Sequence, residues 1–329
     1  AWRELLGRPN VADKRWIWEQ YDHLVGANTV RRPAAADAAV VRLPTGAGLA
    51  VSLDGAERHC EADARGGGMA VVCEAARNLA ATGARPLAIT DCLNFANPEK
   101  GETGWRLREV IAGMSEALDA FGIPVVSGNV SLYNESATRR IYPTPIVGMV
   151  GLIDDVTRSV PLALGPEGHA LALIGYGEPR LDGSEYLGDD AGLPPRPEPM
   201  RDAALCRSLV DAAADGLLAG AHDISGGGLA TTLAESAIAA GHGARVTLVG
   251  GPRPDVALFG EGGGRVLVSA TDAHLDLLAK RLPEGIVLTR IGVCGGDELS
   301  IDLGDRGLSL DLAEAHAAYA AGLTEAMGA

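Results

Sequence analysis

The sequence has few lysines, few aromatic residues and an excess of acidic over basic side chains. Lysine occurs only at positions 14, 100 and 280, and aromatic residues make up 4% of the 329 residues. Asp and Glu number 43 against 28 Lys and Arg, which gives a formal net charge of −15. Proteins bind nucleic acid mainly through clustered Lys and Arg, so this balance argues against a nucleic-acid partner and favours a small-molecule ligand.

Several common nucleotide-binding and catalytic motifs are also absent. No lysine completes a G-x-x-x-x-G-K-[ST] run, which excludes a P-loop. There is no G-x-S-x-G or H-E-x-x-H run, so a hydrolase would lack its nucleophile or its metal. The glycine-rich run at 260–264 precedes a strand instead of following one into a helix, and we therefore interpret it as a turn.

The cysteines and the apolar runs place limits on the cellular setting. The five cysteines are odd in number, widely spaced and free of any C-x-x-C pair, so we expect reduced, mostly buried thiols and no zinc site. The longest apolar runs are about six to eight residues, against roughly 20 for a membrane helix. The first residues lack the basic-then-apolar order of a secretion signal. We therefore expect a cytoplasmic protein without a membrane association.

The pattern of apolar residues predicts an α/β protein of two units. Hydrophobic residues make up 47% and charged residues 22%, as in ordinary globular domains. Short apolar strands alternate with helical patterns, and this pattern restarts near 154–164. We predict an arm or a tail of a preceding domain at 1–35, a first α/β unit at 36–155 and a second at 156–329. The arm carries three tryptophans but no continuous helical or strand pattern.

Polar residues follow two predicted strands of the first unit. Asp91 follows the strand 86–90, and Gly128 and Asn129 follow the strand 123–127. Ligands of α/β sheets usually bind at the carboxyl ends of the strands. Asp91 and Asn129 offer the oxygen ligands that Mg²⁺ takes when it also holds nucleotide phosphates, and Gly128 permits a close backbone approach. The alternative is that Asp91 and Asn129 only cap turns.

Four long motifs in the same order resemble phosphoribosylformylglycinamidine synthase, and the resemblance continues to the C-terminus. They are residues 75–86, 90–95, 127–135 and 143–151. Residues 16–22 and 25–29 resemble the segment that joins the two halves of that enzyme. The chain is therefore similar to its C-terminal half. The resemblance implies a ferredoxin-like A domain followed by an α/β B domain, as in the aminoimidazole ribonucleotide synthetase-like superfamily.

The resemblance also implies a reaction and roles for four residues. In this family ATP phosphorylates the amide oxygen of formylglycinamide ribonucleotide, and ammonia from glutamine displaces the phosphate to form an amidine. By matching motif, Asp91 and Gly128 would contact ATP, Asn129 would bind Mg²⁺ and Ser131 would contact the ribonucleotide. The implied partners are the N-terminal half, a glutaminase subunit and a small bridging subunit.

The chain departs from the family pattern in two respects. The Ser-His-Asn-His run of the family's first half is absent, so we expect the catalytic histidines in the N-terminal half and no activity from this chain alone. The aspartate that the family usually has within the run at 225–228 is also absent, which puts metal or phosphate contact there in doubt. We interpret His222 and Asp223 as residues that orient a turn.

Three other expectations follow from this resemblance. The chain could be a non-catalytic nucleotide-binding scaffold, because one of two pseudosymmetric sites in such a duplicated enzyme can be structural. It could be a relative such as aminoimidazole ribonucleotide synthetase or selenophosphate synthetase, although the run at 127–135 argues against this. A homodimer through the A domain could replace the pairing of two A domains in one enzyme.

Overall fold

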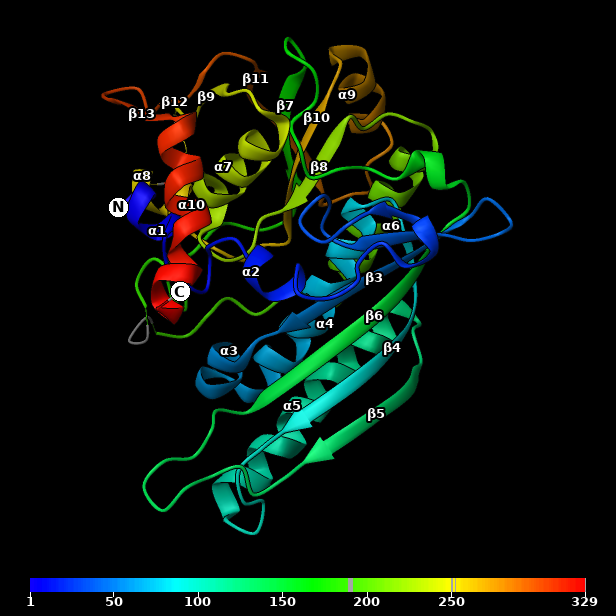
Figure 1. The fold of residues 1–329 in the computed structure, drawn as a ribbon, viewed down its shortest axis with the longest axis vertical. Helices are drawn as coiled ribbons and strands as arrows, with labels where there is room; N and C mark the ends of the chain where they lie inside the picture. Colours follow the sequence, from blue (N-terminus) through cyan, green and yellow to red (C-terminus); the bar gives the residue numbers. More distant parts are fainter. Residues whose placement is uncertain (189–191, 250, 252, 329) are drawn as a thin grey trace.

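Two mixed sheets with helices between and beside them form the protein, as a computed structural model shows for residues 1–188, 192–249, 251 and 253–328 (Figure 1). This confirms the prediction of an α/β protein. No helix in the described part of the chain is long and apolar enough to cross a membrane.

The first sheet has six strands in the order β1-β2-β3-β6-β4-β5. β4 and β5 are parallel, and the other neighbouring strands are antiparallel. The strands are β1 (Thr29–Arg31), β2 (Ala39–Arg42), β3 (Gly48–Gly55), β4 (Arg85–Asn94), β5 (Val125–Ser131) and β6 (Thr144–Ile153).

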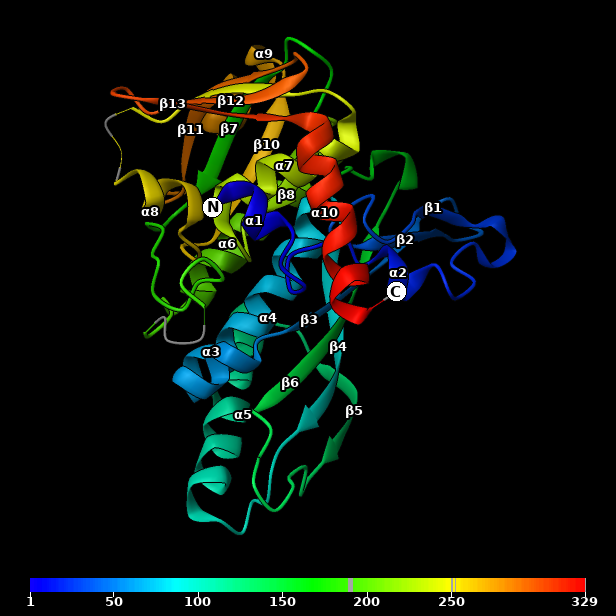
Figure 2. The same cartoon turned by 60° about the vertical axis from the view of Figure 1, so that its left-hand side comes forward.

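Helices α3 (Glu57–Ala62), α4 (Ala64–Ala81) and α5 (Gly101–Phe121) belong to the same unit, and α4 and α5 cover one face of the sheet (Figure 2). Asp63 caps α4 by accepting a hydrogen bond from the backbone N–H of Gly66. The glycines of α4 allow close helix packing, because a Cβ at Gly68 would lie 2.2 Å from the carbonyl oxygen of Val110 on α5. The left-handed Gly122, at φ 68°, ends α5 as its position in the sequence predicts.

The opposite face of the first sheet is open. Side chains alternate along β6, where Val147 and Met149 are buried under the helices. Along β6, β4 and β5 no helix of the described chain lies over the other face (Figures 1 and 2). Leu53 on β3 is 74% exposed and Val126 on β5 is 67% exposed. The exposed apolar side chains on the open side of this sheet, here called the bare sheet surface, are Val41, Val51, Leu53, Leu87 and Val126.

The second sheet has seven strands in the order β13-β12-β9-β11-β7-β10-β8. They are β7 (Ala170–Gly175), β8 (Gly220–Asp223), β9 (Ala244–Thr247), β10 (Arg265–Ala270), β11 (Val287–Cys294), β12 (Glu298–Asp302) and β13 (Gly307–Asp311). Residues 220–223 form the edge strand β8, so His222 and Asp223 lie in a strand that leads into the following turn.

The helices of the second unit cover both faces of its sheet. They are α6 (Pro199–Ala214), α7 (Gly228–Ala240), α8 (Pro254–Phe259), α9 (Asp272–Ala279) and α10 (Leu312–Met327). One apolar cluster joins α4 and the first sheet to α6, α9 and one face of the second sheet. A second cluster joins the other face to α7 and α10. The two units therefore share a continuous core.

The N-terminal arm packs mainly on the second unit, although it is adjacent in sequence to the first. Helix α1 (Trp2–Leu6) contacts α7 and α10, and the indole N–H of Trp2 donates to the carbonyl of Ala230 at 2.9 Å. Leu5 and Leu6 are buried in the second apolar cluster. Helix α2 (Arg15–Trp18) follows, and β1 then joins the first sheet.

Candidate functional site

The parallel pairing of β4 and β5 brings the four residues singled out in the sequence onto neighbouring strands. Asp91 lies opposite Gly128 in the register, Cys92 opposite Asn129, and Asn94 opposite Ser131. Asp91, Gly128 and Asn129 line one open hollow of about 470 Å³ together with Val125, Val126 and Val130. Ser131 lies at the end of β5, beside this hollow.

The structure groups the four residues into two pairs on opposite faces of the sheet. Asp91 lies two residues from both Ile89 and Leu93 along β4, so its side chain is on the same face as theirs, the face covered by the helices. Asn129 and Ser131 pair with Cys92 and Asn94 and therefore lie on the open face. Because β5 is the last strand and is exposed along most of its length, a ligand that contacts both pairs would cross its free edge.

The carboxylate of Asp91 lies directly over Gly128. A Cβ atom at Gly128 would come within 2.5 Å of Oδ1 of Asp91, so only glycine fits there without displacing the carboxylate. Among the described residues Asp91 has no hydrogen-bond or ion-pair partner, and partial burial raises its pKa. A residue that capped a turn would bond to a backbone N–H, so this geometry argues against the capping alternative for Asp91.

Asn129 and Ser131 differ in how firmly they are held. Cys92 Sγ lies 3.4 Å from Oδ1 of Asn129. Asn134 holds the end of β5, because its Nδ2 donates to the carbonyl of Ser131 at 2.9 Å and to its Oγ at 3.1 Å. Tyr133, which lies between Ser131 and Asn134 in the sequence, has a left-handed φ of 62°. This conformation is rare for a bulky side chain and occurs mainly at constrained, often functional, positions.

Cys92 and Asn94 are neighbours of the site that were not predicted from the sequence. Cys92 is partly exposed, whereas the other four cysteines are buried, so the expectation of mostly buried thiols holds for four of the five. Nδ2 of Asn94 donates to the carbonyls of Cys92 at 3.1 Å and Thr144 at 3.3 Å. The available signal was that Cys92 and Asn94 belong to the motif at 90–95. Which face of the sheet their side chains occupy depends on the register between β4 and β5.

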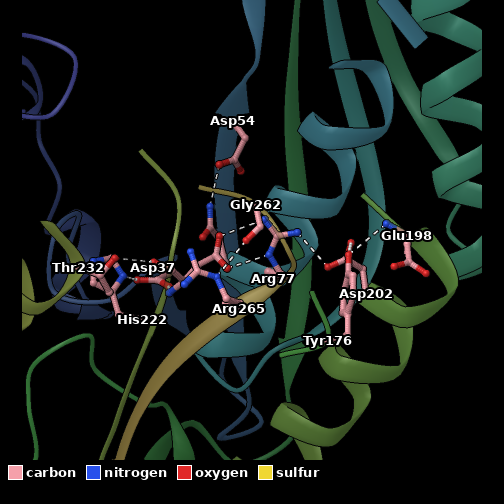
Figure 3. Close-up of polar contacts among 12 residues, drawn as sticks. Asp37, Asp54, Arg77, Tyr176, Glu198, Asp202, His222, Thr232, Gly262 and Arg265 are labelled. Carbon is pink, nitrogen blue, oxygen red and sulfur yellow. Dashed lines mark hydrogen bonds and ion pairs between the residues drawn. The ribbon is translucent and has the colours of Figure 1, made fainter. Parts of the chain in front are cut away.

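A second group of polar residues lies where α4 meets the second unit (Figure 3). It consists of Arg77, Asp202, Asp223 and Tyr176 and is here called the junction cluster. Nη1 of Arg77 on α4 donates to Asp202 on α6 at 2.9 Å, and its Nε donates to Asp223 on β8 at 2.8 Å. Burial alone would lower the pKa of Arg77, but Asp223 and Asp202 raise it well above its usual range. The hydroxyl of Tyr176 donates to Asp202 at 2.7 Å. Arg77 therefore stays charged and links the two units.

His222 on β8 lies between two carboxylates. Its Nδ1 lies 2.6 Å from Asp37 and its Nε2 lies 2.9 Å from Glu235. Burial opposes the charged imidazolium, but the two carboxylates outweigh it and raise the pKa of His222 well above its usual range. These contacts support a structural role for His222 at the edge of the second sheet.

A cavity of about 180 Å³ lies beside the junction cluster, between α3, α4 and the loops at 224–226 and 261–264 of the second unit. Glu74 and Glu261 line it. Burial raises the pKa of Glu74 to about 7 and that of Glu261 to about 8. In the described ranges no three His, Cys, Asp or Glu residues are grouped so that they could hold a metal ion.

The family comparisons agree with this architecture. Residues 35–153 match the AIR synthase related protein, N-terminal domain, and residues 167–304 match the AIR synthase related protein, C-terminal domain. The chain belongs to the AIR synthase-related family. This confirms the family and the fold that the sequence motifs indicate.

Within this family, the chain resembles phosphoribosylformylglycinamidine synthase subunit PurL. It is 45% identical to that protein of Moorella thermoacetica over 313 residues, covering 92% of this chain and 42% of the relative. It is 46% identical to the Bradyrhizobium sp. (strain BTAi1) protein over 310 residues, covering 92% and 42%. The chain thus spans about two-fifths of the length of these relatives.

Solved structures of PurL from Thermotoga maritima have the same fold. The complex with FGAR superposes with a TM-score of 0.77 at 17% identity, over 96% of this chain and 52% of that one. The complex with ATP superposes with a TM-score of 0.71 at 18% identity, over 84% and 46%. At these identities the likeness concerns the fold alone.

Proposed function

We propose that this chain is the part of a phosphoribosylformylglycinamidine synthase that contributes Asp91, Gly128, Asn129 and Ser131 to an ATP- and Mg²⁺-dependent amidation site in the cytoplasm. The observation that carries the proposal is the carboxylate of Asp91, which lies over Gly128 within the parallel pairing of β4 and β5 and has no partner among the described residues. The similarity to PurL relatives supports the reaction, and the T. maritima PurL complexes with ATP, ADP and AMPPCP support the nucleotide.

Mg²⁺ fits this donor set. The protein would supply the amide oxygen of Asn129, and phosphate oxygens and waters would complete the octahedron that Mg²⁺ prefers. The ion would neutralise phosphate charge near an acidic chain. Ser131 would donate its hydroxyl to the ribonucleotide, while Asn134 fixes the end of β5.

Partner chains follow from the same proposal. A PurLQS complex is known from T. maritima, which supports assembly with a glutaminase subunit that supplies ammonia and with a small bridging subunit. The N-terminal half of the enzyme would supply the catalytic histidines. The competing proposal of a nucleotide-binding scaffold predicts ATP binding without any contribution to turnover.

Substitution of Asp91 by Asn is expected to weaken MgATP binding by roughly 1–3 kcal/mol, the range for losing a contact to a charged group. Calorimetric titration of the chain with ATP, with and without Mg²⁺, measures this, and Asp119→Asn on exposed α5 is the matched control. Gly128→Ala should act in the same direction, because its Cβ would displace the carboxylate. Equal affinity for Asp91→Asn, or binding that is indifferent to Mg²⁺, would contradict the assignment.

The bare sheet surface is expected to make the isolated chain associate at micromolar concentration. A contiguous apolar patch and an unpaired edge strand favour pairing, and a two-fold dimer is the simplest closed solution. Light scattering should give twice the monomer mass, with a buried interface above about 1,000 Å² in total. Val126→Asp should yield monomers, whereas Val287→Asp, at a similarly exposed position of the second sheet, should not. A stable monomer of the unmodified chain would refute this prediction.

A further inference from the structure

A second hollow, of about 500 Å³, lies between Glu57 at the start of α3 and residues 134–144, and is here called the hairpin hollow. Asn134 lines it and also donates to the carbonyl of Ser131 at 2.9 Å and to its Oγ at 3.1 Å. Thr144 lines it as well, and its carbonyl accepts a hydrogen bond from Asn94, the residue opposite Ser131 in the register. The hairpin hollow therefore adjoins the residue that the proposed function assigns to the ribonucleotide.

The segment that connects β5 to β6 (Figure 1) folds back on itself as a short hairpin. The N–H of Ile141 donates to the carbonyl of Asn134 at 3.2 Å, and the N–H of Ser136 donates to the carbonyl of Arg139 at 2.7 Å. Oγ of Ser136 accepts a hydrogen bond from the N–H of Arg139 at 3.1 Å. These bonds fix the backbone of Arg139 at the turn of the hairpin.

Both arms of this hairpin are anchored to neighbouring segments. Nη2 and Nη1 of Arg140 donate to the two carboxylate oxygens of Glu61 on α3 at 2.7 and 3.0 Å. Glu135 accepts a hydrogen bond from the N–H of Asn97 at 3.1 Å and pairs with Lys100. The charges of Arg140 and Glu135 are thus compensated by other residues of the chain.

Two other charged side chains of the hairpin hollow are not compensated in this way. Arg139 is exposed, and its guanidinium has no hydrogen-bond or ion-pair partner among the described residues. The carboxylate of Glu57 has none either within the part of the chain that the structure describes. The hairpin hollow therefore offers one free guanidinium and one free carboxylate to a ligand.

These two groups match the polar groups of a sugar phosphate. A guanidinium binds phosphate oxygens through two parallel hydrogen bonds. A carboxylate only accepts hydrogen bonds, and it suits ribose hydroxyls, as it does in dinucleotide-binding folds. A single guanidinium fits a phosphomonoester better than a polyphosphate, which is usually bound together with a metal ion. Because the hairpin is already anchored, binding loses little free energy to the ordering of its backbone.

We propose that the hairpin hollow binds the ribose 5-phosphate part of the ribonucleotide, with the guanidinium of Arg139 on the phosphate and the carboxylate of Glu57 on the ribose hydroxyls. Ser131 would contact the same ligand from the adjoining end of β5. The identity of the ligand rests on the proposed function, whereas the subsite rests on the geometry of the hairpin. Arg139 and Glu57 bind and orient the substrate, and no bond is made or broken at them.

Calorimetric titration of the full chain with ribose 5-phosphate at low ionic strength tests the proposal. Arg139→Gln should raise the dissociation constant about tenfold or more, the effect of losing a hydrogen bond between charged groups. Glu57→Gln should weaken the binding of ribose 5-phosphate but not that of inorganic phosphate. Arg108→Gln, the matched control, removes an exposed arginine of α5 outside the hollow and should bind like the unmodified chain.

Three results of this titration would overturn the proposal. They are the lack of saturable binding of ribose 5-phosphate to the unmodified chain, equal affinity in Arg139→Gln, and inorganic phosphate that binds as tightly as ribose 5-phosphate. Arg139→Lys keeps the charge without the planar fork, so its affinity should lie between those of the unmodified chain and Arg139→Gln.

The same variants separate a failure of this subsite from a failure of the proposed function. Asp91→Asn should leave ribose 5-phosphate binding unchanged, and Arg139→Gln should leave MgATP binding unchanged. If Asp91→Asn does not affect MgATP while ribose 5-phosphate binding depends on Arg139, the subsite stands and the nucleotide assignment is wrong. With the N-terminal half added, Arg139→Gln should raise the KM for formylglycinamide ribonucleotide and leave kcat and the KM for ATP nearly unchanged. An unchanged KM for this ribonucleotide in Arg139→Gln would contradict the subsite.

Discussion

The chain alone is expected to form no formylglycinamidine ribonucleotide from ATP, formylglycinamide ribonucleotide and ammonia. The residues that line the hollow at β4 and β5 include no histidine and no lysine, and Asp91 is the one titratable side chain among the described lining residues. His222 is held between two carboxylates, and burial lowers the pKa of His59 beside the second unit. A positioned acid or base typically contributes 10²–10⁴-fold to a rate, and none lies at this hollow apart from Asp91.

The assay is product formation with a large excess of ammonia, which bypasses any need for a glutaminase. Adding the N-terminal half as a separate chain should restore turnover. The same mixture made with the Asp91→Asn variant of this chain should show less turnover. Turnover above background by the chain alone would refute the half-site proposal. Turnover in the mixture that is indifferent to Asp91→Asn would favour the scaffold alternative instead.

The existence of β4 and β5 could be predicted from the sequence because their signals are local. Apolar runs at 86–90 and 123–127 predicted two buried strands, but β4 extends to Asn94 and β5 to Ser131, so Asp91 and Asn129 lie within these strands and not after them. The separation of Asp91 and Asn129 onto opposite faces could not be predicted, because it depends on the register between β4 and β5. A shift of one residue would exchange the faces.

The junction cluster was not predicted because its pairs are distant in sequence. Arg77 bonds to residues 125 and 146 positions away. The available signal was an arginine among alanines on the apolar face of α4, at a position where a charged side chain needs a buried partner. The same limit applies to β8, whose four residues form a strand only because β10 pairs with them.

Replacing Arg77 by Ala is expected to destabilise the chain by about 3–5 kcal/mol, the cost of removing one partner from a buried ion pair. Asp202 and Asp223 are almost fully buried, and both would be left without their shared cation. Since whole domains are stable by only about 5–15 kcal/mol, this is a large fraction of the total. Urea unfolding at pH 7, followed by circular dichroism and tryptophan fluorescence to check for two-state behaviour, measures the loss.

Two variants test whether this loss comes from the buried pair or from the helix. Arg65→Ala removes an exposed arginine of the same helix that pairs with Glu116 on the surface, and it should leave the unfolding midpoint nearly unchanged. Arg77→Lys keeps the charge but cannot reach both carboxylates in the same fork, so its effect should lie between those of the other two variants. If Arg77→Ala unfolds at the same urea concentration as the unmodified chain, the junction cluster does not hold the two units together.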